Sequence, residues 1–577
     1  MALGRRTWLA ALMMVTALLM GAAEYYTWRV GWYPQSAAWK GPAVHLLHGS
    51  DILFILPLGA VTLGALFLLT KGMGRIPALS WRDPGPGRFT DPPFAAVTFI
   101  LMAAWLPFFL VFFPGTAMND TTDILRAELW AAGQHTFLYC LYLGGLGELS
   151  TMVTGNTAAG VALASFLQMM LMAFAIAYTV SWLYRRTGAF WLAGLLTAYY
   201  ALTPMIVNYS FANVKDALFS AVILLWVPLL YELGERRHEE DMWQRMEGEF
   251  IFFSLGMLLL RNNGRYVYMV LLLFLVIFLK QCRWRVGLTG LALIAVSMVP
   301  NAALGFFMDV PQLFQERVGI PIQQVARVVA ADRPLTKAET SYISRVMWPE
   351  RVKQQYDPFT ADGVKWDRYF TFDYFNHHPD EFWKTWQSLG KRYPKDYVEA
   401  WMLATYGYWS FPAPDGETQS RFGWALSMKD LTAPYGMSPL NNNAYQTGTM
   451  LHVYPKEVQE KMGRYLFDHS RYAGAGTCFW IMTAIALVLM VRRQYSRLLI
   501  LLPACLIWGT LIVATPAAFV YRYVFFFPLC MPLFLLLPYL PVQKNHRRGR
   551  KKAPPSGASW RDGRTHWKDD DEEVVFR

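Results

Sequence analysis

The sequence predicts an α-helical polytopic membrane protein with about twelve transmembrane helices and a mainly helical extracytoplasmic domain inserted before the last three spans. Three observations support this fold class. Of the 577 residues, 54% are hydrophobic and only 16% are charged, whereas about a quarter of the residues of a soluble protein are charged. The apolar residues form runs long enough to cross a bilayer. The Lys and Arg residues gather in every second loop, as expected for cytoplasmic loops.

The distribution of charge also argues against nucleic acid as a partner. The formal net charge is +12, but the basic residues form short clusters between apolar runs instead of one basic surface. The five cysteines lie in or beside apolar runs or in a basic loop, without a disulfide framework or a paired-cysteine metal motif. We therefore expect the partners of the chain to include membrane lipids, and we expect no nucleic acid.

The first predicted unit covers residues 1–91 and contains two spans and a cytoplasmic loop. Gly4-Arg5-Arg6 and the apolar residues after them have the layout of a secretory signal peptide. The aromatic residues that follow resemble an interfacial belt, which favours an uncleaved anchor. Both interpretations place the next loop outside, and residues 52–70 then return to a cytoplasmic loop rich in Pro, Gly and Arg.

The predicted catalytic core covers residues 92–308. Its first span, residues 92–113, leads outward into an acidic external loop, residues 114–136. A short apolar segment, residues 137–146, is expected to lie at the membrane interface. The remaining spans of the core are expected at residues 158–183, 189–207, 217–231, 250–260, 266–279 and 286–307.

The predicted extracytoplasmic domain covers residues 309–472, which contain many charges and no apolar run able to cross a hydrocarbon core of roughly 30 Å. Thr336 and Glu339 have the spacing of a capping box, and Pro379-Asp380-Glu381 is typical of a helix start. The aromatic residues of 397–411 indicate either core packing or a surface helix that lies on the bilayer or closes a site.

The C-terminal unit, residues 473–540, contains three further spans, at residues 473–491, 498–512 and 517–540. Residues 541–577 are expected to form a disordered cytoplasmic tail whose basic part rests on anionic lipid headgroups. With this alternation the chain is a multi-pass protein of the plasma membrane, both termini are cytoplasmic and residues 309–472 are extracytoplasmic.

Candidate functional residues lie at the external ends of the predicted spans. In the acidic loop, Asp120 either caps a surface helix or acts as a general base or a ligand for a divalent cation. Charges at later external span ends are candidates for a basic cradle around a phosphate or diphosphate, because intramembrane charges usually serve function and guanidinium groups match phosphate oxygens. The further candidates are Asp123, His135, Lys215, Asp216, Arg261, Arg265 and Arg522.

Several common nucleotide-binding and catalytic motifs are absent from the sequence. It contains no Walker loop, no dinucleotide-binding glycine motif, no zinc-protease helix motif and no serine-hydrolase elbow. His377 and His378 are adjacent, so their side chains point to different sides of a regular element and a metal site there is not expected. The energy for a synthetic reaction would therefore come with the substrate, and an activated lipid-linked donor is the simplest such source.

From residue 92 to residue 540 the chain resembles the C-type superfamily of membrane glycosyltransferases (GT-C). The shared pattern is an outward span ending in Pro-Gly, an acid a few residues later, a second acid after a later span, multiple spans and a late external domain. The chain is similar, more closely, to a set of uncharacterised bacterial membrane proteins near that superfamily. The segments that carry this similarity are Phe113-Pro114-Gly115 with Asp120, Lys215-Asp216, Leu260-Arg261-Asn262-Asn263-Gly264, Thr405-Tyr406-Gly407-Tyr408-Trp409 and Tyr521-Arg522-Tyr523.

The resemblance implies a GT-C-like fold and transfer of a sugar from a polyprenyl-phosphate donor to an extracytoplasmic acceptor of the bacterial cell envelope. Asp120 is then the candidate base and Asp216 a second catalytic acid. The candidate phosphate ligands are Lys215, Arg261, Arg265, Arg522 and His135.

A divalent cation, Mg²⁺ or Mn²⁺, is a candidate cofactor with Asp120 and Asp123 as ligands. Relatives with a double-acid motif have adjacent or alternating acids, whereas these two are three residues apart, which suits one helical face better than joint chelation. A transporter or lipid flippase and a non-catalytic envelope assembly protein are the alternative functions.

Overall fold

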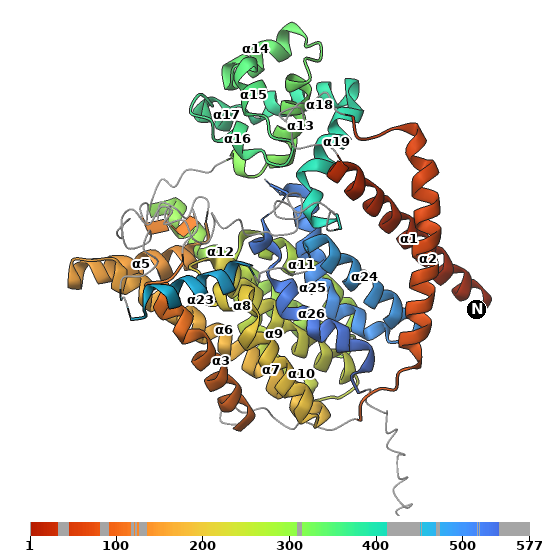
Figure 1. The fold of residues 1–577 in the computed structure, drawn as a ribbon, viewed down its shortest axis with the longest axis vertical. Helices are drawn as coiled ribbons and strands as arrows, with labels where there is room; N and C mark the ends of the chain where they lie inside the picture. Colours follow the sequence, from red (N-terminus) through yellow and green to blue (C-terminus); the bar gives the residue numbers. More distant parts are fainter. Residues whose placement is uncertain are drawn as a thin grey trace, which may run out of the picture.

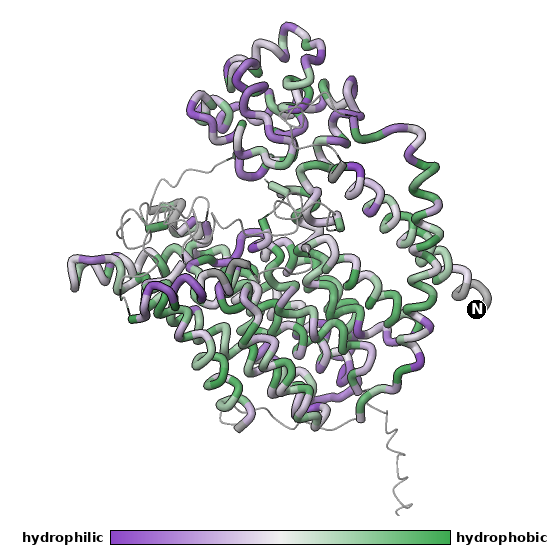
Figure 2. The backbone as a smooth tube through the Cα atoms, viewed as in Figure 1, coloured by the Kyte–Doolittle hydropathy of each residue, from purple (hydrophilic) through white to green (hydrophobic). Residues whose placement is uncertain are grey.

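The structure is a computed structural model, and its described part consists of helices and the connections between them, with isolated β-bridges but no β-strand. Figure 1 shows a large helical bundle, a long hairpin of α1 and α2 along one side, and a smaller helical domain at one end. Hydrophobic residues dominate the bundle, whereas hydrophilic residues are frequent in the smaller domain (Figure 2). The described residues are 2–32, 45–80, 92–116, 120–121, 124–125, 135–307, 314–411, 451, 453–468, 474–515, 517–518 and 520–541.

Within this part of the chain, seven helical segments are long and apolar enough to cross a membrane, or eight if a bent pair counts as one span. They support the prediction of a polytopic helical membrane protein. The helices in these seven segments are α1 (Ala2–Trp32), α2 (Ile52–Arg75), α3 (Pro92–Val111), α6 (Ala158–Thr187), α9 (Lys215–Glu235), α25 (Leu498–Ala514) and α26 (Phe526–Leu536), the last flanked by η8 (Tyr521–Val524) and η9 (Leu537–Tyr539).

Four further helices lie over predicted spans. Two of them, α11 (Asn262–Phe278) and α24 (Ala475–Val491), are apolar but shorter than the seven. The other two are α10 (Met242–Leu260) and α12 (Arg283–Phe307). The total of about twelve spans therefore stays a prediction.

One predicted span, residues 189–207, is broken. The chain forms α7 (Phe190–Leu202) and α8 (Pro204–Phe211), which are bent by 64°. Pro204 has no N–H to continue the helical hydrogen bonds, and it forces Thr203 into an extended conformation with φ −71° and ψ 111°. As a result α8, which is wholly buried, turns into the bundle and leads to the start of α9.

Helix α9 lies in the centre of the bundle, packed against α6, α10, α25 and α26. It is buried along most of its length, which matches its apolar sequence on all sides. Its first residues, Lys215 and Asp216, therefore lie in the middle of one end of the bundle. The segment predicted to lie at the interface, residues 137–146, belongs to α5 (Phe137–Thr154), which packs on α6 and projects sideways in Figure 1.

The small domain has its own apolar core between residues 318 and 397. The predicted capping box is confirmed, because Glu339 N donates to Thr336 Oγ1 at 3.3 Å and Thr336 N donates to Glu339 Oε2 at 2.8 Å. The predicted helix start at Pro379 is also confirmed. The helices of this domain are α13 (Gly319–Ala330), α14 (Lys337–Val346), α15 (Pro349–Gln355), α16 (Asp362–Lys365), α17 (Phe372–His377), α18 (Pro379–Arg392) and α19 (Pro394–Ala404), with η4 (Phe314–Glu316) before them.

The later part of the predicted domain packs on the bundle instead. Helix α23 (Lys456–Asp468) lies against α3 and α8. The aromatic segment after α19, which includes η5 (Tyr406–Tyr408), contacts α24 and α25. Trp480 Nε1 donates to the carbonyl of Trp409 at 2.7 Å, and Trp508 Nε1 donates to that of Tyr408 at 2.7 Å. The aromatic residues of this segment thus join the domain to the bundle by core packing.

Candidate functional site

The predicted Pro-Gly turn after α3 positions the acidic loop. Gly115 has φ 133°, which L side chains rarely adopt, and a Cβ atom there would lie 2.1 Å from Ser165 Oγ. The next residue, Thr116, forms a parallel bridge with Ala212 and accepts a hydrogen bond from Asn213 N at 2.9 Å. The loop is therefore fixed along the connection between α8 and α9.

Asn213 links this connection to both α6 and the acidic loop. Its Nδ2 donates to Ser165 Oγ at 2.7 Å, and Ser165 Oγ donates to the carbonyl of Pro114 at 2.7 Å. Thr121 Oγ1 donates to the carbonyl of Asn213 at 2.6 Å. These bonds bring Asp120, the neighbour of Thr121, to the start of α9.

Asp120 lies between two cations. Lys215 Nζ donates to Asp120 Oδ2 at 3.0 Å, and Arg522 Nη2 donates to Asp120 Oδ1 at 3.0 Å. The Asp120 side chain is 16% exposed. Burial alone would raise the pKa of Asp120, but the nearby charges of Arg522 and Lys215 outweigh it and hold this pKa well below its usual range. Asp120 is therefore an ionised carboxylate at neutral pH.

Asp216 lies on the other side of Arg522. Arg261 Nη1 is 3.1 Å from Asp216 Oδ1, and Arg522 Nε is 3.9 Å from Asp216 Oδ2. The Asp216 side chain is only 1% exposed, and within the described residues neither of its oxygens accepts a hydrogen bond. Arg522 thus contacts both carboxylates, and Arg261 and Arg522 lie beside the same carboxylate, that of Asp216.

The break between α10 and α11 holds Arg261 in place. Arg261 is extended, with φ −149° and ψ 135°. Its Nη1 donates to the carbonyl of Tyr523 at 3.2 Å, and its guanidinium lies over the Tyr523 ring, 4.6 Å from the ring centre. Asn263 Nδ2 donates to Thr510 Oγ1 at 3.0 Å, which ties the break to α25. At Gly264 a Cβ atom would lie 2.1 Å from the Met257 carbonyl, so only glycine permits this close approach.

His135 completes the cluster. Its Nδ1 lies 2.7 Å from Lys215 Nζ and 3.8 Å from Asp120 Oδ2. Because an ammonium group can only donate, Nδ1 accepts and the hydrogen of a neutral ring is on Nε2. Burial first, and then the charge of Lys215, lowers the pKa of His135 to about 3. Nε2 is buried and has no hydrogen-bond partner in the described part of the chain. This leaves one buried donor available to a ligand beside the cluster.

One predicted site residue lies apart from this arrangement, and another lies outside the described residues. Arg265 lies in the first turn of α11, four residues after Arg261, and no described contact joins it to the cluster. Asp123, and with it the predicted pairing of Asp120 and Asp123, lies outside the described residues. Since cations contact both oxygens of Asp120, the described residues do not fit a divalent cation at that carboxylate.

The cluster has an excess of positive charge. Lys215, Arg261 and Arg522 face Asp120 and Asp216, while His135 is neutral, so three cations against two carboxylates leave a net charge of +1. A ligand with a single negative charge would balance this excess. Arginine and lysine side chains in a buried setting are also the groups that bind phosphate oxygens most strongly.

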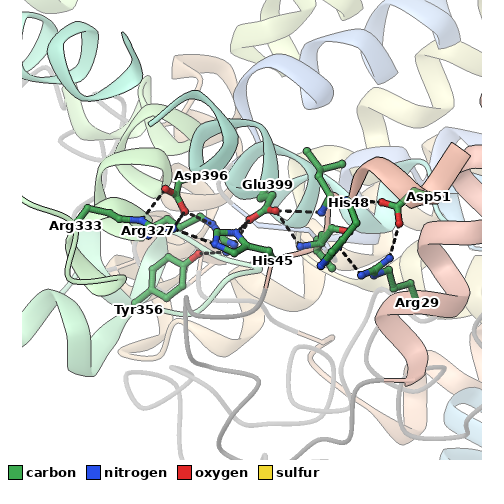
Figure 3. A network of polar contacts seen from close by, with 11 residues as sticks. Arg29, His45, His48, Asp51, Arg327, Arg333, Tyr356, Asp396 and Glu399 are labelled. Carbon is green, nitrogen blue, oxygen red and sulfur yellow. Dashed lines mark hydrogen bonds and ion pairs between the residues drawn. The ribbon is translucent and has the colours of Figure 1, made fainter. Parts of the chain in front are cut away.

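A second polar cluster joins the α1–α2 hairpin to the small domain (Figure 3). His45, Asp396 and Glu399 bring ligand atoms within 4.8 Å of one another, as a metal site would. However, Arg333 Nε contacts Asp396 Oδ2 at 3.0 Å, and Arg327 forms an ion pair with Glu399. These guanidinium groups already neutralise the two carboxylates, so this cluster is an ion-pair network.

This network has a structural role. The backbone N–H groups of Leu46 and Leu47 donate to Glu399 Oε1 at 2.9 and 3.1 Å. Next to it, Asp51 accepts from Arg29 Nη1 at 2.6 Å and from Tyr25 OH at 2.8 Å. The network could not be predicted from the sequence, since the contacts of His45 and Leu46 with Glu399 join residues more than 350 positions apart and have no local motif. It holds the hairpin against the small domain.

Comparison with known proteins gives a family but no activity. Residues 130–568 match a family of unknown function (DUF6020). The matched range contains most of the cluster, including Lys215, Arg261 and Arg522, and begins after Asp120. No curated protein and no solved structure is detectably similar to the chain.

Proposed function

The chain belongs to the DUF6020 family of unknown function, and we propose that it is a membrane glycosyltransferase of GT-C-like fold. The donor is a sugar linked to a polyprenyl phosphate, and the acceptor is a glycan, lipid or protein of the cell envelope. The observation that carries this proposal is the buried cluster at one end of the bundle, where cations from three distant segments surround two carboxylates.

The charge of the cluster favours a monophosphate donor. A sugar joined to a polyprenyl monophosphate is a phosphodiester with one negative charge, which balances the net charge of +1 on the cluster. Arg522 offers a guanidinium fork for two phosphate oxygens, and Lys215 offers a mobile point charge beside it. The unpaired Nε2–H of His135 supplies one more donor for a phosphate or sugar oxygen.

The reaction is a direct displacement at the anomeric carbon. Asp120 accepts the proton of the acceptor hydroxyl while the acceptor oxygen forms a bond to this carbon. The bond from the same carbon to the phosphate oxygen breaks, and polyprenyl phosphate leaves with the electron pair. Lys215, Arg261 and Arg522 stabilise the negative charge on the departing phosphate, because fixed charges in a site with little water need no reorganisation.

The same ion pairs couple donor binding to the strength of the base. Without donor, Lys215 and Arg522 contact Asp120 and make it a weak base. The donor phosphate competes for these two cations, so Asp120 loses part of their stabilisation and its pKa rises toward the ordinary range. The base is therefore strengthened only when a donor is present.

We propose that the cluster and the small domain face the outside of the cell, because the Lys/Arg-rich loops lie at the opposite end of the spans. In a background without native cysteines, Asp362→Cys should react with an impermeant maleimide in intact cells. Gly549→Cys should react only after permeabilisation. The reverse pattern would place the site in the cytoplasm and remove the proposed acceptor.

The function is tested by transfer from defined donors. Purified protein in lipid nanodiscs is incubated with radiolabelled sugars on polyprenyl monophosphate or polyprenyl diphosphate and with a cell-envelope extract. We expect released polyprenyl phosphate and a labelled product from the monophosphate donor, with little product from the diphosphate. If no donor of either class yields product or protects the protein against heat, the proposal is wrong.

A broken helix favours transport as a second candidate function. The bend of 64° between α7 and α8 resembles the discontinuous helices of transporters, whose substrates bind near such breaks. A flippase would move the intact lipid-linked sugar across the membrane, without cleaving its glycosidic bond. Proteoliposomes that translocate a labelled donor with this bond intact, and yield no transfer product, would support transport instead.

A further inference from the structure

A hollow lies at the end of the bundle opposite the polar cluster. It has a volume of about 610 Å³ and is formed by the connection after α9, the end of α11 and the start of α25. Because α9 has 21 residues and rises 1.5 Å per residue, this end lies roughly 30 Å from Lys215, about the thickness of a hydrocarbon core. The hollow therefore lies near the membrane surface opposite the proposed active site.

The lining of this hollow is amphiphilic. Its polar side contains Arg237 and Lys280. Its apolar side continues onto the outer flank of α11, where Phe274 is 48% and Ile277 63% exposed. The full apolar lining consists of Phe274, Ile277, Phe278, Leu498, Leu499 and Leu502.

Arg237 and Lys280 have no carboxylate partner in the described part of the chain. Arg237 Nη1 donates to the carbonyl of Gly234 at 2.7 Å, and its guanidinium lies over the Phe278 ring, 5.6 Å from the ring centre; neither partner carries a negative charge. Three nearby acids pair with other arginines, and Glu240 is exposed and forms no ion pair with Arg237 or Lys280 in the described part of the chain. Glu235 contacts Arg497 at 3.3 Å, Glu239 contacts Arg236 at 3.3 Å and Asp241 contacts Arg245 at 2.5 Å. The hollow thus combines two unneutralised cations with an apolar wall.

We propose that this hollow binds an anionic phospholipid of the surrounding bilayer. The phosphate of the headgroup lies between Arg237 and Lys280, and one acyl chain follows Phe274 and Ile277 along α11. A small soluble anion would use the cations but leave the apolar wall exposed to water. A lipid satisfies both parts, since each Lys or Arg near the surface attracts an anionic headgroup and each buried methylene adds hydrophobic stabilisation.

The test measures retention of lipid by the full chain. Protein in detergent is mixed with phosphatidylglycerol or phosphatidylcholine, and bound lipid is counted by native mass spectrometry. We expect selective retention of phosphatidylglycerol, with affinity reduced roughly tenfold or more in the Arg237→Gln/Lys280→Gln double variant. The matched control is Arg283→Gln/Arg285→Gln, which removes equal charge from exposed positions at the same end. Equal losses in both double variants would show diffuse attraction and overturn the proposal.

Two further measurements do not depend on the folding of the charge variants. Ile277→Trp fills the apolar part without changing charge, and should weaken phosphatidylglycerol retention severalfold. Inorganic phosphate at millimolar concentration should not displace the lipid, because it cannot use the apolar wall. Displacement by phosphate, or unchanged retention in Ile277→Trp, would show that the hollow does not seat a lipid chain.

Discussion

Asp120→Asn is expected to lower sugar transfer by roughly a hundredfold to ten-thousandfold, the usual contribution of a positioned general base. The amide has nearly the size of the carboxylate and its oxygen still accepts one hydrogen bond, but it cannot take the acceptor proton. The loss of two ion pairs should also lower the melting temperature somewhat, because Lys215 and Arg522 each lose a carboxylate partner. The measurement is turnover of a labelled polyprenyl-phosphate sugar by purified variants.

Binding and pH dependence separate catalysis from a structural effect. The Asp120→Asn variant should still bind donor, because removing a negative charge leaves the cationic cradle intact. Asp123→Asn is the control, and it should lose much less activity. In the parent, Asp120 stays ionised and His135 stays neutral as the pH falls from 8 to 5, since both pKa values lie below this window. kcat/KM should therefore not decrease as the pH falls from 8 to 5. Full activity in Asp120→Asn would show that Asp120 is not the base, and Asp216 or a residue of the small domain would then be the candidate.

The helices could be predicted from the sequence because their signals are local. Apolar runs, flanking arginines and capping residues gave the positions of α6, α9 and α11 to within a few residues. The bend between α7 and α8 had a local signal too, in Thr203-Pro204, but the continuous apolar composition of residues 189–207 outweighed it in the prediction. Composition predicts burial, whereas proline decides whether the helix continues.

The contacts of the site could be predicted only in part. The alternation of basic loops predicts that Asp120, Lys215, Arg261 and Arg522 lie on one side of the membrane. Their pairing depends on the direction in which α8 enters the bundle and on the contact of Thr116 with Ala212. Pro204 signals that the helix breaks but not the direction of the next helix, and the contact of Thr116 with Ala212 has no sequence signature. Contacts at the opposite end of the bundle were equally hard to predict. Arg186 follows a predicted span, which suggests an exposed cation in a loop, but its side chain is buried in an ion pair with Glu232.

Arg522→Ala is expected to weaken donor binding by roughly thirtyfold or more, since removing one partner of a buried charge pair typically costs a few kcal/mol. The structure gives the reason that this residue matters more than the other cations. Arg522 contacts both Asp120 and Asp216, so its loss leaves less positive charge to neutralise these two carboxylates. The same change removes the fork that would hold two phosphate oxygens.

Arg522→Lys keeps the charge but has a single ammonium group, which cannot contact both carboxylates and the phosphate in the fork geometry. Its donor affinity should therefore lie between those of the parent and Arg522→Ala. The control is Arg265→Ala, which removes a cation at the same end of the bundle without touching the cluster, and should leave binding unchanged. Affinity is measured by donor-induced thermal stabilisation and by competition with polyprenyl phosphate. If both Arg522 variants bound the donor as tightly as the parent, the excess positive charge would serve only to neutralise the buried acids and the phosphate would have to bind elsewhere.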